Sequence, residues 1–171
     1  EKESVARIAA MSGDRALVDA AKAFMVASTP PKYSYNFFWL GRPIIQYPQD
    51  IVAVQELIWT LRPDLIVETG IAHGGSLVMS ASMLALLDVC DALSSGKGFD
   101  PAASRRKVVG IDVDIRAHNR AAIEAHPLAA YIEMIEASST APEIVERVGR
   151  LAQGYERVLV RHAWVHVPTD S

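Results

Sequence analysis

The residue types best suited to chemistry lie together in one short segment, residues 66–76. This segment predicts an apolar strand that ends in an acid, a glycine-rich bend, and a helix that begins at Ser76. Such a unit presents backbone N–H groups and a helix N-terminus at the carboxyl edge of a parallel sheet, where open α/β proteins bind small ligands. The segment therefore predicts a ligand site, although a tight connecting turn alone would also require permissive glycines.

The spacing of the segment restricts the kind of ligand. The pattern E-x-G-x-x-x-G-G-S, which begins at Glu68, lacks both the Gly-Lys-Ser/Thr of a phosphate loop and the full dinucleotide fingerprint. Glu68, at the strand end, can accept a hydrogen bond or face a positive group. An acid just before the first glycine suits a cofactor that carries an amine better than one that carries a pyrophosphate.

Two further polar groups follow the next two predicted strands. Asp112 stands where a carboxylate can bind both ribose hydroxyls of an adenosine-containing ligand, although it could also be a turn or capping acid. The small polar segment Glu136-Ala137-Ser138-Ser139 follows the third strand and could line an adenine slot. A helix cap would explain Ser139 equally well.

The elements that must position these groups alternate along the chain. Apolar runs and turn residues predict strands at 64–68, 108–112, 131–135 and 157–160, and helices at 50–61, 76–92, 117–125 and 143–151. This order predicts an α/β fold, a Rossmann-like doubly wound parallel sheet with helices on both faces. Right-handed crossovers place all carboxyl strand ends, and with them Glu68, Asp112 and Glu136, at one edge.

The segments before the first strand predict a separate leader. Residues 1–32 show near-helical apolar spacing that is interrupted around Gly13, so we expect one broken helix or two short ones before Pro30-Pro31. Residues 33–171 form the predicted cofactor-binding domain. Its aromatic segment 33–47 predicts a loop. The loop either packs its rings over the hydrophobic core or covers a ligand site as a flap.

Composition narrows the class of protein. The chain has 171 residues, 50% of them hydrophobic, and a net charge of −3, which predicts a sizeable core and no basic surface for nucleic acid. The single cysteine, Cys90, excludes an internal disulfide framework. The apolar runs are shorter than a membrane span and Glu1-Lys2-Glu3 does not resemble a signal peptide, so we expect a cytoplasmic protein.

Three motifs in order, 67–76, 109–116 and 136–140, together with the block 39–50, resemble the cephalosporin hydroxylase family. This family is similar to S-adenosylmethionine-dependent O-methyltransferases and includes rhamnosyl O-methyltransferases; the likeness covers residues 33–160. The resemblance implies a methyltransferase-type fold, S-adenosylmethionine as cofactor, and a small-molecule or sugar hydroxyl as methyl acceptor. By position it places the methionine part of the cofactor beside Glu68, Gly70, His73, Gly74, Gly75 and Ser76, the ribose on Asp112, and the adenine beside Ser138 and Ser139.

The sequence departs from the family after the fourth strand. There the family has an Asp-Ser pair, a His-rich stretch and further strands with acids that hold a divalent metal, Mg²⁺, and supply the proton acceptor. Here the fourth strand is followed by residues 161–171, Arg-His-Ala-Trp-Val-His-Val-Pro-Thr-Asp-Ser, which depart from that arrangement. We therefore expect an incomplete sheet, and we assign no metal ligand and no catalytic residue. His162 and His166 have metal-ligand spacing for a helix, but Val165, Val167 and Pro168 disfavour a helix there.

Three functions compete on this basis. The first is an O-methyltransferase, the second is a truncated relative that binds cofactor or assembles without turnover, and the third is a nicotinamide-dependent oxidoreductase, which the incomplete fingerprint disfavours. A sheet that ends at its fourth strand also leaves an unpaired edge. We therefore expect low stability for the isolated chain, or pairing with another copy as a homo-oligomer.

Overall fold

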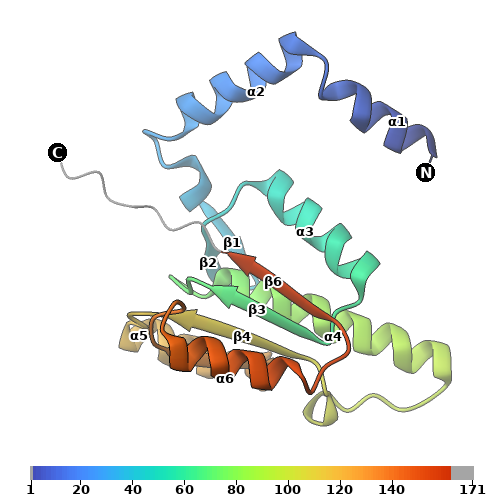
Figure 1. Cartoon of the computed structure of the whole chain (residues 1–171), viewed down its shortest axis with the longest axis vertical. Helices are drawn as coiled ribbons and strands as arrows, with labels where there is room; N and C mark the ends of the chain where they lie inside the picture. The colour runs from blue at the N-terminus through green and yellow to red at the C-terminus, as the bar shows by residue number, and fades with distance from the viewer. Residues whose placement is uncertain (1, 163–171) are drawn as a thin grey trace.

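The computed structural model describes residues 2–162, which form helices and strands in alternation (Figure 1). The α-helices are α1 (Lys2–Met11), α2 (Arg15–Ser28), α3 (Pro48–Leu61), α4 (Gly75–Ser95), α5 (Ala117–Glu124) and α6 (Pro142–Ala152). The strands are β1 (Phe37–Trp39), β2 (Arg42–Ile44), β3 (Leu65–Thr69), β4 (Lys107–Asp112), β5 (Ile132–Glu136) and β6 (Val158–His162). Short 3₁₀ turns are η1 (Tyr33–Tyr35), η2 (Pro101–Ala103) and η3 (Ala129–Tyr131).

Four of the strands form one parallel sheet in the order β5-β4-β3-β6. Thr69 at the end of β3 pairs with Ile111 of β4 on one side and with His162 of β6 on the other. The chain winds outward from β3 to β5 and then returns to the other side of β3. The carboxyl ends of β3 and β6 therefore meet where the winding direction reverses, which is the ligand-binding position of doubly wound sheets.

Helices cover both faces of this sheet, and the predicted Rossmann-like fold is confirmed. Ile66 of β3 packs on one face, in a core with helices α3, α4 and α5. Leu65 and Val67 point to the opposite face and pack with α6, because successive strand side chains alternate. The expected strand and helix positions were correct to within a few residues.

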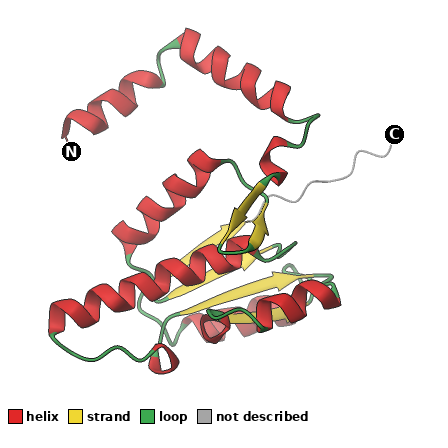
Figure 2. Ribbon diagram, turned by 180° about the vertical axis from the view of Figure 1, so that it is seen from behind, coloured by secondary structure: helices red, strands yellow, loops and turns green. Residues whose placement is uncertain are grey.

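Helix α4 is the central element of the first core and runs along the sheet (Figure 2). By length and composition it is the one described helix that could cross a membrane, but 56% of its most apolar window is buried inside the fold. Leu77, Leu84 and Leu87 are fully buried, and each such side chain stabilises the fold by about 1.5–3 kcal/mol. These features are those of a core helix of a globular protein.

The aromatic segment 33–47 is not the loop that the sequence predicted. It folds into an antiparallel hairpin of β1 and β2, with Phe37 paired to Ile44. Leu40 and Gly41 both have positive φ and form its two-residue turn. Ile44 is buried in the first core, so the hairpin is anchored to the sheet domain rather than lying loosely over it.

The leader consists of two helices, as the interruption at Gly13 predicted. Asp14 caps the second helix by accepting a hydrogen bond from the Leu17 N–H at 3.1 Å. Helix α1 has no buried residue and α2 buries only Ser28, whose hydroxyl bonds the Tyr47 hydroxyl at 2.7 Å. Both helices extend away from the sheet in Figure 1. The domain boundary at residue 32 stays a prediction.

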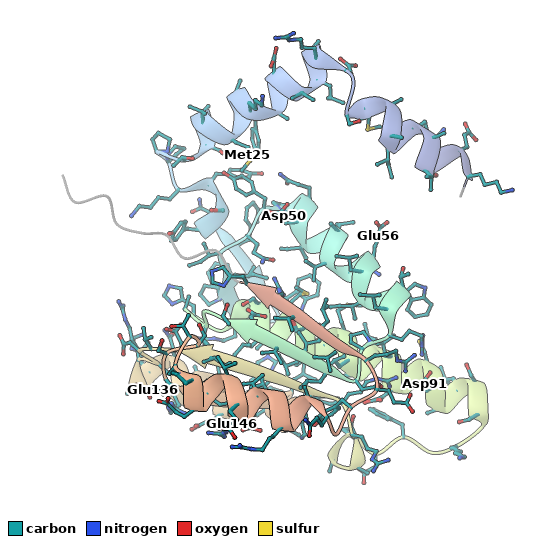
Figure 3. The ribbon with its side chains drawn as sticks, in the orientation of Figure 1. Met25, Asp50, Glu56, Asp91, Glu136 and Glu146 are labelled. Carbon is teal, nitrogen blue, oxygen red and sulfur yellow. The ribbon has the colours of Figure 1, made fainter. Side chains whose placement is uncertain are left out.

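An ionic cluster lies at the opposite edge of the sheet from the strand tips. Arg106 pairs with Asp88 and, at 2.8 Å, with Asp91, which Figure 3 shows at the far end of the fold from Glu136. Asp88 also accepts a hydrogen bond from the Tyr131 hydroxyl at 2.8 Å. The cluster ties α4 to the start of β4 and to η3, so it stabilises the sheet without taking part in the site.

Candidate functional site

The connection from β3 to α4 contains three residues with left-handed backbone conformation. Gly70, Ala72 and Gly74 have φ values of 87°, 46° and 82°. At Gly74 a Cβ atom would also lie 2.4 Å from Cδ1 of Ile123, so a side chain is excluded by both conformation and space. The glycine pattern noticed in the sequence therefore encodes a specific loop shape.

The carboxylate of Asp112 holds this loop from the neighbouring strand tip. Its Oδ2 accepts hydrogen bonds from the N–H of Ile71 at 2.6 Å and of Ala72 at 3.4 Å. Its Oδ1 accepts one from the N–H of Asp114 at 3.3 Å. Asp112 is thus brought beside the loop as predicted, and in this structure it acts as a capping acid.

Two residues from outside the strand tips complete the anchoring. The Asn119 side chain, 4% exposed, donates to the Ala72 carbonyl at 2.9 Å. Arg42 of the hairpin donates from Nε to the His73 carbonyl at 3.0 Å and from Nη2 to Asn119 Oδ1 at 3.0 Å. Two of these contacts hold loop carbonyls and the third joins the two anchoring side chains, so the loop shape is fixed before any ligand arrives.

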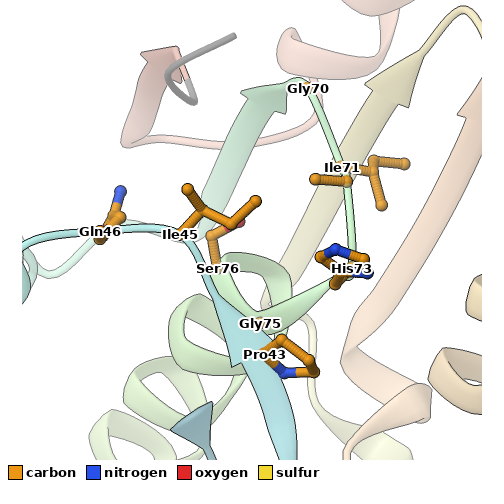
Figure 4. A pocket seen from close by; sticks show the side chains of 9 residues that line it. Pro43, Ile45, Gln46, Gly70, Ile71, His73, Gly75 and Ser76 are labelled. Carbon is orange, nitrogen blue, oxygen red and sulfur yellow. The ribbon is translucent and has the colours of Figure 1, made fainter. Parts of the chain in front are cut away.

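The loop and the hairpin border an open pocket, and the space between them is about 320 Å³ when the solvent at its mouth is counted. Figure 4 shows Ile45 and Gln46 on one side and Ile71 and His73 on the other. The pocket is lined by Pro43, Ile45, Gln46, Gly70, Ile71, Ala72, His73, Gly75 and Ser76. Four of the predicted cofactor-binding residues, Gly70, His73, Gly75 and Ser76, therefore meet at one cavity.

The N-terminus of α4 forms the base of this pocket. Its N-cap, Gly74, has no side chain, and no side chain caps the helix. The first N–H groups of a helix have no partner within it and carry a partial positive charge. At Gly75 a Cβ would lie 2.2 Å from the Pro43 carbonyl oxygen, so the helix and β2 are in close backbone contact.

Glu68 does not line this pocket. Its side chain is fully buried on the α4 side of the sheet, and its Oε2 lies 3.4 Å from Nη1 of Arg161 in β6. Neither carboxylate oxygen accepts a hydrogen bond of normal geometry. Burial raises the pKa of Glu68, and Arg161 and the nearby Ser76 and Ser80 hydroxyls only partly oppose this. The positive group that Glu68 faces is supplied by the chain itself.

The third strand tip is also separate from the pocket. Glu136 is exposed and pairs with Arg120 at 2.8 Å. The Ser138 hydroxyl bonds the Thr140 hydroxyl at 3.0 Å, and Ser139 does not cap α6, whose N-cap is Ala141. The structure thus places Ser138 and Ser139 beyond β5, two strands from the glycine loop, outside the pocket lining.

The residues between 2 and 162 do not fit a divalent metal site. They contain no group of three or more His, Cys, Asp or Glu side chains arranged to hold an ion. At the tips of β3 and β6 stand Thr69 and His162, whose hydroxyl and Nδ1 are hydrogen-bonded to each other. His162 belongs to a strand rather than a helix, and His166 lies outside the described residues. No step of a mechanism is therefore assigned to Mg²⁺.

Sequence reasoning missed three residues of the site, which are Arg42, Gln46 and Asn119. Arg42 is the first residue of β2 and Gln46 follows that strand, in a hairpin too short to show a strand pattern, and Asn119 lies within an ordinary helix sequence. The signal that could have indicated Gln46 is its position in the block 39–50, which resembled the family without a role for each residue. Its side chain is 8% exposed, and its Oε1 is buried without a hydrogen-bond partner.

A parallel sheet of this order with a glycine loop at its reversal point defines a Rossmann-like α/β protein. A family model described as rhamnosyl O-methyltransferase/CmcI matches residues 31–168, and the chain belongs to this family. The rhamnosyl O-methyltransferase of Mycobacterium leprae (strain TN) is 28% identical over 117 residues, which are 68% of this chain and 42% of that protein. The resemblance inferred from the motifs is confirmed.

A solved structure of CmcI shares the fold. In its apo form CmcI is 18% identical, with a TM-score of 0.51 over 79% of this chain and 48% of that one. A CmcI structure with SAH is 19% identical, with a TM-score of 0.47 over 76% of this chain and 54% of that one. The chain therefore spans about half the length of the relatives it matches.

Proposed function

We propose that this chain binds S-adenosylmethionine at the 70–76 loop and serves an O-methyltransferase reaction on a small-molecule or sugar hydroxyl. The observation that carries the proposal is the pre-shaped loop beneath an uncapped helix N-terminus, in a chain that belongs to the rhamnosyl O-methyltransferase/CmcI family. Membership of this family supports the reaction class. The pocket at the N-terminus of α4 is a suitable place for a ligand with an anionic group.

The roles of the chain's own residues follow from their positions. The 70–76 loop would bind the methionine part of the cofactor, with its carboxylate at the N-terminus of α4. Asp112 would exchange its weak bond to Ala72, 3.4 Å long, for a ribose hydroxyl, and the Asn119 anchor would keep the loop in place. When bound, the cofactor supplies an activated methyl group that passes to the acceptor oxygen as the hydroxyl proton is lost.

The acceptor would lie beside the tips of β3 and β6, where Thr69 and His162 border the loop. This crevice is the position where doubly wound sheets bind ligands. No described residue is assigned as the base that takes the hydroxyl proton. A second candidate function, a cofactor-binding or assembly module without turnover, is favoured by one observation: the residues between 2 and 162 offer no metal ligand set.

Transfer of a labelled methyl group from S-adenosylmethionine to sugar and polyol acceptors, with and without added Mg²⁺, tests the enzymatic proposal. Label in an acceptor would support the methyltransferase, and metal-independent transfer would agree with the absence of a ligand set in the described part. Cofactor binding with no transfer to any acceptor would favour the module. Binding of NAD in place of S-adenosylmethionine would favour the oxidoreductase, the third reading.

The remaining expectations about partners stay predictions. β6 pairs only with β3 among the described strands, and Val158 and Val160 on one of its faces are 38% and 68% exposed. The predicted homo-oligomer stays a prediction. A cytoplasmic location likewise remains our proposal.

A further inference from the structure

Ala72 has a backbone conformation that its own residue type disfavours. The glycine loop has three left-handed residues, and glycine occupies the first and the third, Gly70 and Gly74, where such φ values are unstrained. Ala72, between them, has a φ of 46°. A residue with a Cβ atom is disfavoured about five- to thirtyfold in that conformation. Its methyl group is exposed, so packing does not hold it there.

Side chains from three separate elements converge on this residue and on the next carbonyl. Asp112 at the tip of β4 accepts a hydrogen bond from the Ala72 N–H at 3.4 Å, and Asn119 of α5 donates to the Ala72 carbonyl at 2.9 Å. Arg42 of β2 donates to the His73 carbonyl at 3.0 Å. It also donates to Asn119 Oδ1 at 3.0 Å. The anchors of the loop are thus concentrated where its backbone is strained.

The hydrogen bonds of the loop itself do not hold Ala72. The bond that closes the loop, which Figure 4 shows beside the hairpin, runs from the Gly74 N–H to the Ile71 carbonyl at 2.8 Å. It uses neither backbone group of Ala72. Strain of this kind persists only where the surrounding groups determine the conformation. The conformation of Ala72 therefore depends on side chains from outside the loop.

We propose that Arg42 and Asn119 are positioning residues, a clamp that keeps Ala72 left-handed and so keeps the loop in its cofactor-binding shape. The inference rests on the proposed function, in which Asp112 exchanges its long bond to Ala72 for a ribose hydroxyl when the cofactor binds. The clamp then holds Ala72 in the bound state. Because Arg42 belongs to β2, the clamp also couples the β1–β2 hairpin to the loop.

Replacement of Ala72 by glycine separates positioning from a merely structural role. Asn119→Ala releases the Ala72 carbonyl, so the binding-competent loop becomes a minor population. The affinity for S-adenosylhomocysteine, measured by isothermal titration, should then fall about five- to thirtyfold. Glycine is left-handed without strain, so in the Ala72→Gly background the same change should lower the affinity by less than about threefold. A side chain that only packed α5 against the core would cause the same loss in both backgrounds.

Asn36→Ala is the matched control. The Asn36 amide donates to the carbonyls of Lys32 and Tyr33 at 3.0 and 3.2 Å. Lys32 has a φ of 52°, so this asparagine also holds a left-handed residue that is not glycine. Asn36 is exposed and is not among the residues that line the pocket. Its replacement should leave the affinity for S-adenosylhomocysteine unchanged.

A second variant and a measurement without ligand complete the test. Arg42→Lys keeps the positive charge but loses the forked donor group. It should lower the affinity in the same way, with recovery by Ala72→Gly, even where Asn119→Ala does not fold. Without ligand, the amides of Ile71 and Ala72 should exchange hydrogen about fivefold or more faster in either clamp variant than in Asn36→Ala.

The possible failures of the clamp and of the proposed function are distinguishable. No loss of affinity, equal losses in both backgrounds, or unchanged exchange of the loop amides would overturn the clamp and leave the proposed function standing. A folded wild-type chain that binds no S-adenosylhomocysteine would overturn the proposed function and with it the positioning role. Faster exchange in the clamp variants of such a chain would leave the clamp only as a feature of the fold.

Discussion

The buried pair of Glu68 and Arg161 gives the sharpest stability prediction. The carboxylate is fully buried, the Arg161 side chain is 9% exposed, and 3.4 Å separate Oε2 from Nη1. Arg161→Met would leave the carboxylate buried without a counter-charge, and removal of one partner of a buried ion pair costs about 3–5 kcal/mol. We expect a loss of this size in the free energy of unfolding at neutral pH, measured by urea denaturation.

The loss should depend on pH in a defined direction. Burial raises the pKa of Glu68 above its ordinary value of 4.5, so its contribution to stability is full below that value and is lost as pH rises through the folded pKa. Removal of the Arg161 guanidinium raises the folded pKa further. The difference between wild type and Arg161→Met should therefore be large at about pH 8 and should shrink as pH falls towards 4.5.

A second substitution and a surface control separate charge from packing. Glu68→Gln removes the charge, so the double variant Glu68→Gln/Arg161→Met should recover most of the loss. Arg150→Met breaks an exposed pair with Glu146 on α6 and should change stability little. The reasoning would be refuted if Arg161→Met cost less than about 1 kcal/mol, or if its cost were the same with and without Glu68→Gln.

Three other outcomes are expected. Gly75→Ala should unfold at lower urea than wild type, because its Cβ would lie 2.2 Å from the Pro43 carbonyl oxygen, whereas Gly149→Ala in α6 should gain about 1 kcal/mol. Burial, with Asp88 beside it, raises the pKa of Tyr131 to about 12. The stability that the neutral phenol contributes therefore persists below pH 10.0 and is lost as pH rises through about 12. An ultraviolet titration should show a late tyrosine transition that is missing in Tyr131→Phe, and the same late transition in both proteins would contradict this. Asp112→Ala should weaken S-adenosylmethionine about tenfold or more by equilibrium binding, and unchanged affinity would remove its ribose role.

The sheet was predictable because its local signals are strong and agree with one another. Leu65-Ile66-Val67 is an apolar run of strand length, and the glycines after it mark the turn into α4. The same alternation would have shown that Glu68 shares a face with Ile66 and so points towards α4. Glu68 was predicted to bind the cofactor because it lies at the end of the strand, and the direction of its side chain was not considered.

The remainder of the site depends on contacts that no local pattern encodes. The β1–β2 hairpin has strands of three residues, too short for period-two alternation to be recognised. Arg42 and Asn119 reach the loop from separate elements, and their roles follow only once the fold brings them together. Ser138 and Ser139 follow β5, two strands from the glycine loop in the sheet order, and their assignment to the adenine stays a prediction.

The central claim is that the glycine loop between β3 and α4 forms a binding site for S-adenosylmethionine. Isothermal titration of the purified chain with S-adenosylmethionine, run beside an identical titration with NAD, tests this most directly. We predict saturable heat for one S-adenosylmethionine per chain and none for NAD. A chain that is folded by circular dichroism but gives no heat with S-adenosylmethionine, or that binds NAD instead, would contradict the account.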